Sequence, residues 1–174
     1  MKDIMKKITK IGVCCLVAML MLGSTMSDTK AQKHNDLSID FINLFVQRYV
    51  SLQYEFSLSD ESSLALRLYF APKSSYTNDY SAPGIGAAYR FYVTNNRAVS
   101  GFNLGPAVDA FFFSKTAYAS STIFSIGGDV AYKLLAGNFS VEPQVSLRIV
   151  VAGENVDHYT GTYIYPSVYL GYAW

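Results

Sequence analysis

Cysteine is scarce in this sequence, with Cys14 and Cys15 the only two among 174 residues. Both lie in an uninterrupted apolar run, Ile11 to Gly23, that follows a lysine-rich amino end. Such a run is too short to span a bilayer as a helix and is typical of the hydrophobic region of a secretory signal peptide. We therefore expect residues 1–31 to be a cleavable signal peptide, with cleavage after Ala31. The mature chain would then be exported without disulfides, thiolate catalysis or a cysteine-ligated metal.

The chain also lacks an excess of charge of one sign, because it contains 14 Lys and Arg and 13 Asp and Glu residues. No basic cluster stands outside the amino-terminal run, so we expect no nucleic-acid partner. No group of histidine, cysteine and carboxylate residues has the spacing of metal ligands, so we expect no metal and no cofactor. Histidine occurs as His34 and as His158, beside Asp157 in a polar segment. Since a lone loop histidine is far more often solvated than catalytic, we expect no enzyme.

Helical periodicity is missing after residue 32, whereas apolar residues recur at every second position along the rest of the chain. The clearest case is VSLQYEFSL at 50–58, in which alternate residues are large and apolar. Alternation of this kind predicts β-strands, and it occurs in eight stretches. These stretches are 39–46, 50–58, 63–70, 84–93, 101–112, 122–134, 139–151 and 167–174.

The connections between these stretches alternate in length. The short, turn-like ones are 59–62, 94–100 and 135–138, and the long, polar, tyrosine-rich ones are 72–83, 114–121 and 152–163. The exception is the connection at 47–49, which is short where a long one is expected. Short and long connections gather at opposite ends of an up-and-down meander. We therefore predict an all-β fold, an eight-stranded antiparallel up-and-down β-barrel at 39–174, preceded by a short segment at 32–38.

Alternation alone leaves open which face of the barrel points inward, and volume decides this. Eight strands with about five large apolar residues each carry roughly forty bulky side chains, whereas an eight-stranded barrel has room inside only for side chains of ordinary size. We therefore expect the apolar face, including Leu66 and Val145, to point outward into lipid as a transmembrane barrel. The alternative is a soluble, exported, lipocalin-like ligand-binding barrel, which shares the same alternation.

Charged residues of both signs share the face opposite the apolar one. They are Glu55, Arg67, Arg90, Asp109, Asp129, Lys133, Glu142 and Arg148. Because an unpaired buried charge is costly, we expect these acids and bases to pair as a charge network in the lumen. Equal numbers of each sign favour a filled lumen over an ion-selective pore, which would show a ring of one sign.

Aromatic residues also occupy the inward face, mostly toward the long connections. They are Tyr69, Tyr92, Phe111, Phe113, Tyr165 and Tyr169. We expect them to fill that part of the barrel, since small barrels fill their interiors with side chains. A small pocket for an apolar ligand is the alternative.

Three internal motifs and the last strand carry a family resemblance. The motifs are the pair Tyr54-Glu55, the strand from Gly84 to Tyr92, and Gly105-Pro106. From about Ile39 to Trp174 the chain resembles the small outer-membrane β-barrels of Gram-negative bacteria of the OmpA/OmpX type. Through the three motifs it is similar, more closely, to a largely uncharacterised subgroup of short barrel proteins. The resemblance implies insertion in the outer membrane, with outer-membrane lipid around the barrel.

The last strand alternates apolar residues and ends in an aromatic one. The alternating residues are Val168, Leu170, Tyr172 and Trp174. This pattern resembles the carboxyl-terminal signal by which the outer-membrane insertion machinery recognises its clients. The resemblance implies that machinery as a partner during biogenesis.

The expected function is that of an integral outer-membrane protein with a structural or surface-interaction role. Its long connections at 72–83 and 152–163 are the surfaces expected to contact an extracellular partner, whose identity the sequence does not give. The first alternative is transport of small apolar solutes across the outer membrane, and the second is the soluble lipocalin-like barrel.

Overall fold

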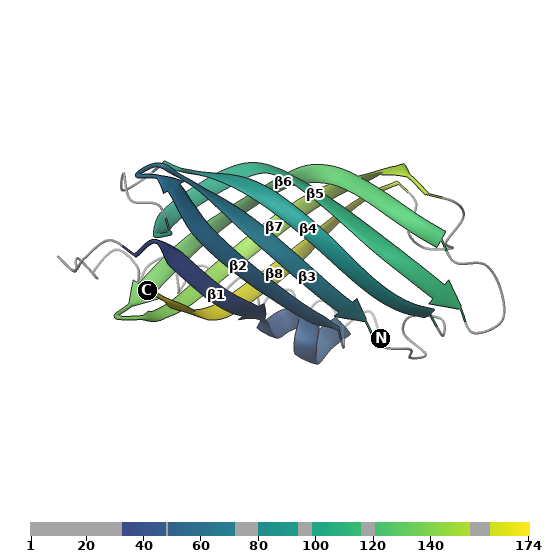
Figure 1. The fold of residues 1–174 in the computed structure, drawn as a ribbon, viewed down its shortest axis with the longest axis horizontal. Coiled ribbons are helices and arrows are strands. Elements are labelled where there is room, and N and C mark those ends of the chain that lie inside the picture. The colour runs from purple at the N-terminus through teal and green to yellow at the C-terminus, as the bar shows by residue number, and fades with distance from the viewer. Residues whose placement is uncertain (1–32, 48, 72–79, 94–98, 116–120, 154–160) are drawn as a thin grey trace, which may run out of the picture. The chain divides into compact units, whose positions relative to one another are not determined.

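Eight antiparallel strands follow one another around a closed barrel, each paired with its neighbours in sequence (Figure 1). This computed structural model describes residues 33–47, 49–71, 80–93, 99–115, 121–153 and 161–174. The strands are β1 (Asn35–Asp40), β2 (Val50–Ser59), β3 (Ser62–Ala71), β4 (Tyr80–Tyr92), β5 (Gly101–Lys115), β6 (Ser121–Ala136), β7 (Phe139–Ala152) and β8 (Thr162–Ala173). The predicted all-β, up-and-down, eight-stranded barrel is therefore confirmed. The segment 1–31, expected to be a signal peptide, lies outside the described residues.

The first strand differs from its prediction. It was expected at 39–46 but runs from Asn35 to Asp40, inside the segment 32–38 that was expected to precede the barrel. Phe41 and Ile42 are already helical, and the π-helix η1 (Asn43–Gln47) follows. The reason is visible in the sequence. From residue 41 onward, apolar residues occupy consecutive positions instead of alternate ones, so the pattern of a strand ends there. A helical segment therefore fills part of the connection that was expected to be short.

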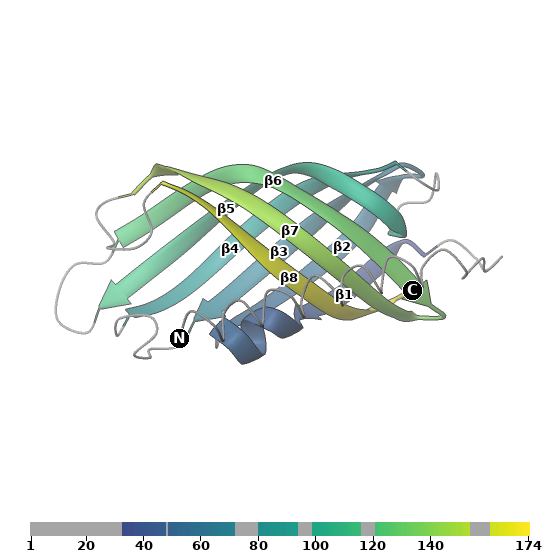
Figure 2. The ribbon, with the colours of Figure 1, turned by 180° about the vertical axis from the view of Figure 1, so that it is seen from behind.

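Backbone pairing between β1 and β8 closes the barrel, and β8 lies between β7 and β1 (Figure 2). The register runs from Asp36 opposite Ala173 to Asp40 opposite Tyr169. Beyond it, the Trp174 amide donates to the Asn35 carbonyl at 3.0 Å, and the Asn35 amide donates to the Trp174 carbonyl at 3.0 Å. The last residue of the sequence is thus held by the sheet.

The two faces of the wall differ in chemistry. Large apolar side chains cover the outside, where Leu66 is 44% and Val145 43% exposed, as the volume argument predicts. Others exposed on this outer wall are Leu68, Ile85, Phe91, Leu104, Val108, Phe124, Val130, Leu147 and Ile164. The largest fully buried side chains are instead cations, with Arg67, Arg90 and Arg148 at 1% exposure or less. No helix among the residues described is long and apolar enough to cross a membrane.

Glycine on the inward face makes room for larger inward side chains. Gly86 on β4 pairs with Arg67 on β3 and with Asp109 on β5. A Cβ added to Gly86 would overlap the Asp109 carboxylate and lie 3.1 Å from a ring carbon of Tyr69. The missing side chain thus allows Tyr69 and Asp109 to approach each other across β4.

We expect Gly86→Val to lower the free energy of unfolding by about 1–3 kcal/mol, because the added side chain overfills the interior. Ala87→Val on the outer wall is the matched control and should change the stability far less. Chemical unfolding followed by the fluorescence of Trp174, the single tryptophan, measures both. Equal effects of the two substitutions would contradict the inward position of Gly86.

Candidate functional site

Buried ion pairs cross the inside of the barrel, and all eight charged residues singled out in the sequence take part. Nearer the end with the short turns, Arg90 pairs with Glu55 at 2.6 Å and with Glu142 at 2.7 Å. Lys133 pairs with the same two carboxylates, at 2.5 Å from Glu55 and 2.9 Å from Glu142. Two cations and two anions therefore alternate in one closed group, which we call the short-turn cluster.

A second group lies closer to the ends where the long connections leave the strands, and we call it the long-loop cluster. Arg67 pairs with Asp129 at 2.6 Å. Arg148 pairs with Asp129 at 2.8 Å and with Asp109 at 2.5 Å. The four side chains are at most a few per cent exposed, so each charge depends on its partners rather than on solvent.

Two glutamines connect the clusters. The Gln53 carbonyl oxygen accepts from Arg67 Nε at 3.0 Å and from Arg90 Nη2 at 2.9 Å. The Gln144 carbonyl oxygen accepts from Arg67 at 3.3 Å and from Arg90 at 2.9 Å. The partial negative charge of both amides therefore lies between two guanidinium groups of like charge. These two residues were not predicted as part of the network because they are uncharged, although their inward parity was a usable signal.

Asp36 and Asp40 are inward carboxylates that the sequence analysis missed. Asp36 is fully buried and lies 3.3 Å from Lys133. Asp40 is also fully buried and accepts from the backbone amides of Asn43, at 3.1 Å, and of Val168, at 3.4 Å. They were missed because the first strand was expected at 39–46. That range left Asp36 outside the barrel and gave Asp40 the same parity as the apolar residues Ile42, Leu44 and Val46.

The balance of charge inside the barrel changes with these two residues. The buried acids among the described residues are Asp36, Asp40, Glu55, Asp109, Asp129 and Glu142, and the buried bases are Arg67, Arg90, Lys133 and Arg148. Acids therefore outnumber bases by six to four, and the expectation of equal numbers was wrong. The signs still alternate within each cluster, which differs from the single-sign ring of an ion-selective pore.

Inward aromatic side chains share the interior with the charges. Tyr69, Tyr92 and Tyr169 are buried, as is Phe113. The Tyr69 hydroxyl donates to Asp109 at 2.8 Å, and the Tyr92 hydroxyl donates to Glu55 at 2.5 Å. The rings thus fill space and supply donors to the charge network.

The same arrangement continues toward the long connections. The ring of Phe111 lies 4.9 Å from that of Tyr69, and the Arg148 guanidinium lies 5.8 Å from the ring of Tyr165. Tyr165 and Phe111 are partly buried. Five of the six inward aromatics therefore lie against another ring or a charged group, and the Tyr169 hydroxyl lies 3.3 Å from the Ser51 hydroxyl. These contacts are expected for side chains that fill a barrel.

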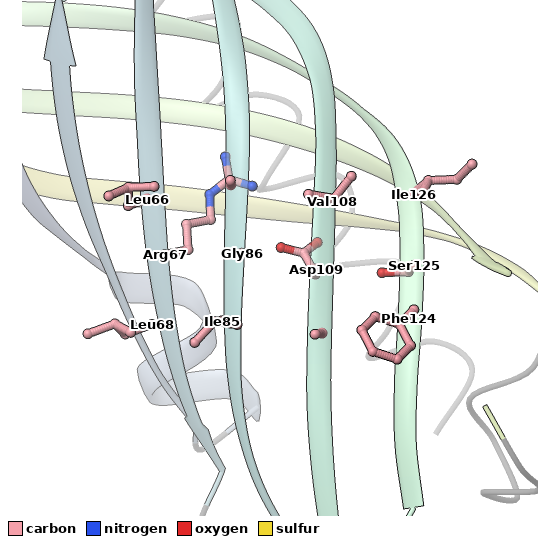
Figure 3. A pocket seen from close by; sticks show the side chains of 12 residues that line it. Leu66, Arg67, Leu68, Ile85, Gly86, Val108, Asp109, Phe124, Ser125 and Ile126 are labelled. Atoms are coloured by element: carbon pink, nitrogen blue, oxygen red, sulfur yellow. The ribbon is translucent and has the colours of Figure 1, made fainter. Parts of the chain in front are cut away.

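The outer wall carries a shallow apolar pocket of about 560 Å³ that crosses β3, β4, β5 and β6 (Figure 3). Its apolar lining residues are Leu66, Leu68, Ile85, Ala87, Val108, Ala110, Phe124 and Ile126. Arg67, Asp109 and Ser125 also contribute to the lining, but they are buried side chains of the inward parity. The surface of the pocket that faces away from the barrel interior is therefore formed by apolar side chains.

The residues of the expected carboxyl-terminal signal lie along the outward face of β8. Val168 and Leu170 are partly buried there, whereas Tyr172 and Trp174 are exposed. The rings of Tyr172 and Trp174 lie 6.2 Å apart, and the Tyr172 hydroxyl accepts from the Asn138 side chain at 2.8 Å.

One of the two histidines lies in the part of the chain that is described. His34 Nδ1 lies 2.8 Å from the Ser57 hydroxyl near the short turns, and His158 lies outside the described residues. No group of three or more histidine, cysteine, aspartate or glutamate residues there has the geometry to hold a metal ion.

Comparison of the chain with protein-family models, with curated proteins and with solved structures found no match. The site is therefore interpreted from its own geometry.

We expect Arg90→Met to lower the free energy of unfolding by about 3–5 kcal/mol, because Glu55 and Glu142 lose a shared buried partner. The matched control is Lys33→Met, since Lys33 is only partly buried and its amine donates a hydrogen bond to the Asn138 side chain at 3.1 Å. That control should cost less than about 1 kcal/mol. Denaturant unfolding of both variants measures the difference, and a loss below about 1 kcal/mol for Arg90→Met would contradict the network's role.

Proposed function

We propose that this chain is an integral outer-membrane β-barrel protein of the Gram-negative type, with a lumen filled by side chains and a structural or surface-interaction role rather than an enzymatic one. The observation that supports it is the distribution of side chains across the wall. Cations and carboxylates are buried inside, and large apolar residues are exposed outside. A soluble protein rarely exposes a contiguous apolar surface of this extent.

A hydrocarbon environment accounts for that distribution. Backbone groups of a closed barrel are all paired between strands, so no sheet edge is left unsatisfied in lipid. Outward residues such as Leu68, Ile85 and Val108 are more than half exposed, and each gains from contact with acyl chains instead of water.

Aromatic residues at one end of the outer wall support the same proposal. Near the short turns, Tyr54, Phe56 and Trp174 lie side by side, with ring centroids 5.9 Å apart for Tyr54 and Phe56 and 6.3 Å apart for Tyr54 and Trp174. Tyr89 and Phe91 pack at 4.7 Å on the same end of the wall. Aromatic girdles of this kind mark the level of lipid headgroups in outer-membrane barrels.

The alternatives receive less support. A lipocalin-like barrel needs an apolar interior to hold its ligand, whereas the described interior carries six carboxylates and four cations. Transport of small apolar solutes needs a passage for them, and ion pairs cross the lumen at two levels. A filled lumen leaves the extracellular connections as the surfaces for a partner, and those at 72–79 and 154–160 lie outside the described residues.

Biogenesis by the outer-membrane insertion machinery belongs to the same proposal. Tyr172 and Trp174 are exposed on the outward face of the strand that closes the barrel. A recognition signal has to be readable on the last strand while the barrel is still open, and these side chains are accessible without unfolding their neighbours.

The location is tested by membrane fractionation combined with a gel shift on heating. We expect the protein in the outer-membrane fraction, migrating faster before boiling than after it because the closed barrel resists detergent. Protein that stays in solution without detergent would contradict the proposal and favour the lipocalin-like alternative.

A charge on the outer wall gives a sharper test. We expect Val145→Arg to lower the stability of the vesicle-inserted barrel by about 2–4 kcal/mol, because Val145 faces the hydrocarbon. Ala136→Arg, at the exposed end of β6 beside a short turn, is the control and should cost about 0–1 kcal/mol. Equal effects at the two positions would contradict a wall surrounded by lipid.

The filled lumen is tested by planar-bilayer recording. We expect the purified protein to show no large, stable conductance, because the buried ion pairs of both clusters block the path. A steady open conductance in the unmodified protein would contradict the filled lumen and support a transport role.

A further inference from the structure

The pocket on the outer wall has a direction that follows from the strand register. Ala87 lies opposite Leu66 and Val108, and Ala110 lies opposite Ile85 and Phe124. The two alanines are therefore diagonal neighbours on adjacent strands. Both alanines line the pocket, and their small side chains form its floor. Leu66 and Ile85 lie on one side of this floor, and Val108 and Phe124 lie on the other (Figure 3).

The larger residues form two ridges with the same diagonal step. Leu66 and Ile85 make one ridge across β3 and β4, and Val108 and Phe124 make the other across β5 and β6. All four side chains are 44–53% exposed, so both ridges project from the wall. A groove one residue wide therefore runs between them over the two alanines.

The groove runs nearly along the barrel axis. Passing from Ala87 to Ala110 crosses one strand, about 4.8 Å, and advances two residues, about 6.6 Å, so the line is inclined to the strands by roughly 35°. Strands of barrels are tilted from the axis by about 35–45°. In Figure 1 strands β3 to β5 descend from left to right, and the step from β4 up to β5 offsets that descent. The inclination of the groove to the strands is opposite to the tilt of the strands from the axis. A linear ligand in the groove would therefore lie nearly parallel to the barrel axis.

The width of the groove limits what can occupy it. The line through the Cα atoms of Ala87 and Ala110 lies about 4 Å from the corresponding line of each ridge. The Cα atoms of the two ridges are therefore about 8 Å apart across the groove. A helix with its side chains is about 10–12 Å wide and could not lie between them. A single hydrocarbon chain fits this space, and acyl chains of a bilayer run in the same direction as the groove.

We propose that the groove over Ala87 and Ala110 is a binding site for one acyl chain of a membrane phospholipid. This inference rests on the proposed membrane location. The exposed lining is hydrocarbon, which suits a ligand segment without donors or acceptors. Among the lining residues the only cation is Arg67, which is buried and paired with Asp129, so nothing there would bind the phosphates of a larger, phosphate-rich lipid.

The experiment is native mass spectrometry of the full protein in octyl glucoside supplied with dimyristoyl phosphatidylcholine. The unmodified barrel should retain one lipid. In A87L/A110L, which fills the floor, the fraction that carries a lipid should fall about four- to fifteenfold, because the acyl chain loses contacts worth one or two buried methylenes. The control V130L/V145L lengthens two exposed side chains of the outer wall away from the groove, by one carbon each, and should retain the lipid.

Other outcomes overturn the inference and remain distinguishable from failure of the proposed function. Equal retention by A87L/A110L and the control would show that the groove does not hold the lipid. Dimers of the unmodified barrel that disappear in A87L/A110L would assign the groove to a second copy of the chain. Insertion of all three proteins into dimyristoyl phosphatidylcholine vesicles, with the gel shift on heating intact, would show that the membrane proposal survives either result. Failure of all three to insert would contradict the proposed function itself.

Discussion

The structure depends on the burial of four cations inside the barrel, where Arg67, Arg90, Lys133 and Arg148 are each at most 1% exposed. Most ion pairs among the described residues join strands that are not neighbours. Several join strands from opposite parts of the wall, such as Arg90 on β4 with Glu142 on β7 and Arg67 on β3 with Asp129 on β6. These pairs can form only when the sheet has closed, because their partners come from opposite sides of the barrel. A buried pair is weak evidence of added stability, but breaking one leaves an uncompensated charge. The network therefore favours the closed barrel in this register over any open or shifted arrangement.

The filled interior determines what the outside can be. Once charges, glutamines and tyrosines occupy the lumen, the large apolar residues of every strand remain on the outer wall. The proposed bilayer would make such a wall favourable, and the aromatic side chains near the short turns would then lie at its boundary. On the same proposal, the groove over Ala87 and Ala110 is the part of the lipid-facing wall that holds one acyl chain in place. Contact with an extracellular partner would then belong to the surfaces outside the bilayer.

Much of the fold could be predicted from the sequence because alternation reports directly on which face each side chain occupies. Leu66 and Val145 point outward, and the inward parity of Arg67 and Glu142 brings them into the lumen. The first strand was the exception, since the six residues from Asn35 to Asp40 offer only Leu37 and Ile39 as an apolar face. The alternation tells which face a side chain occupies, but it does not tell where along the barrel axis that side chain lies. The partners of each charge, the bridging roles of Gln53 and Gln144, and the diagonal of alanines all depend on register, which only the structure supplies.

The position of the outer wall in hydrocarbon is tested most directly by fluorescence quenching of a tryptophan placed on it. Leu66→Trp in a Trp174→Phe background, reconstituted in phosphatidylcholine vesicles, provides a single reporter at the centre of the wall. Strong quenching by lipids brominated near the chain ends, together with protection from aqueous acrylamide, is the result that a lipid-facing wall requires. Quenching by acrylamide without quenching by the brominated chains would mean that the apolar face meets water, and the account of this protein as a membrane barrel would be wrong.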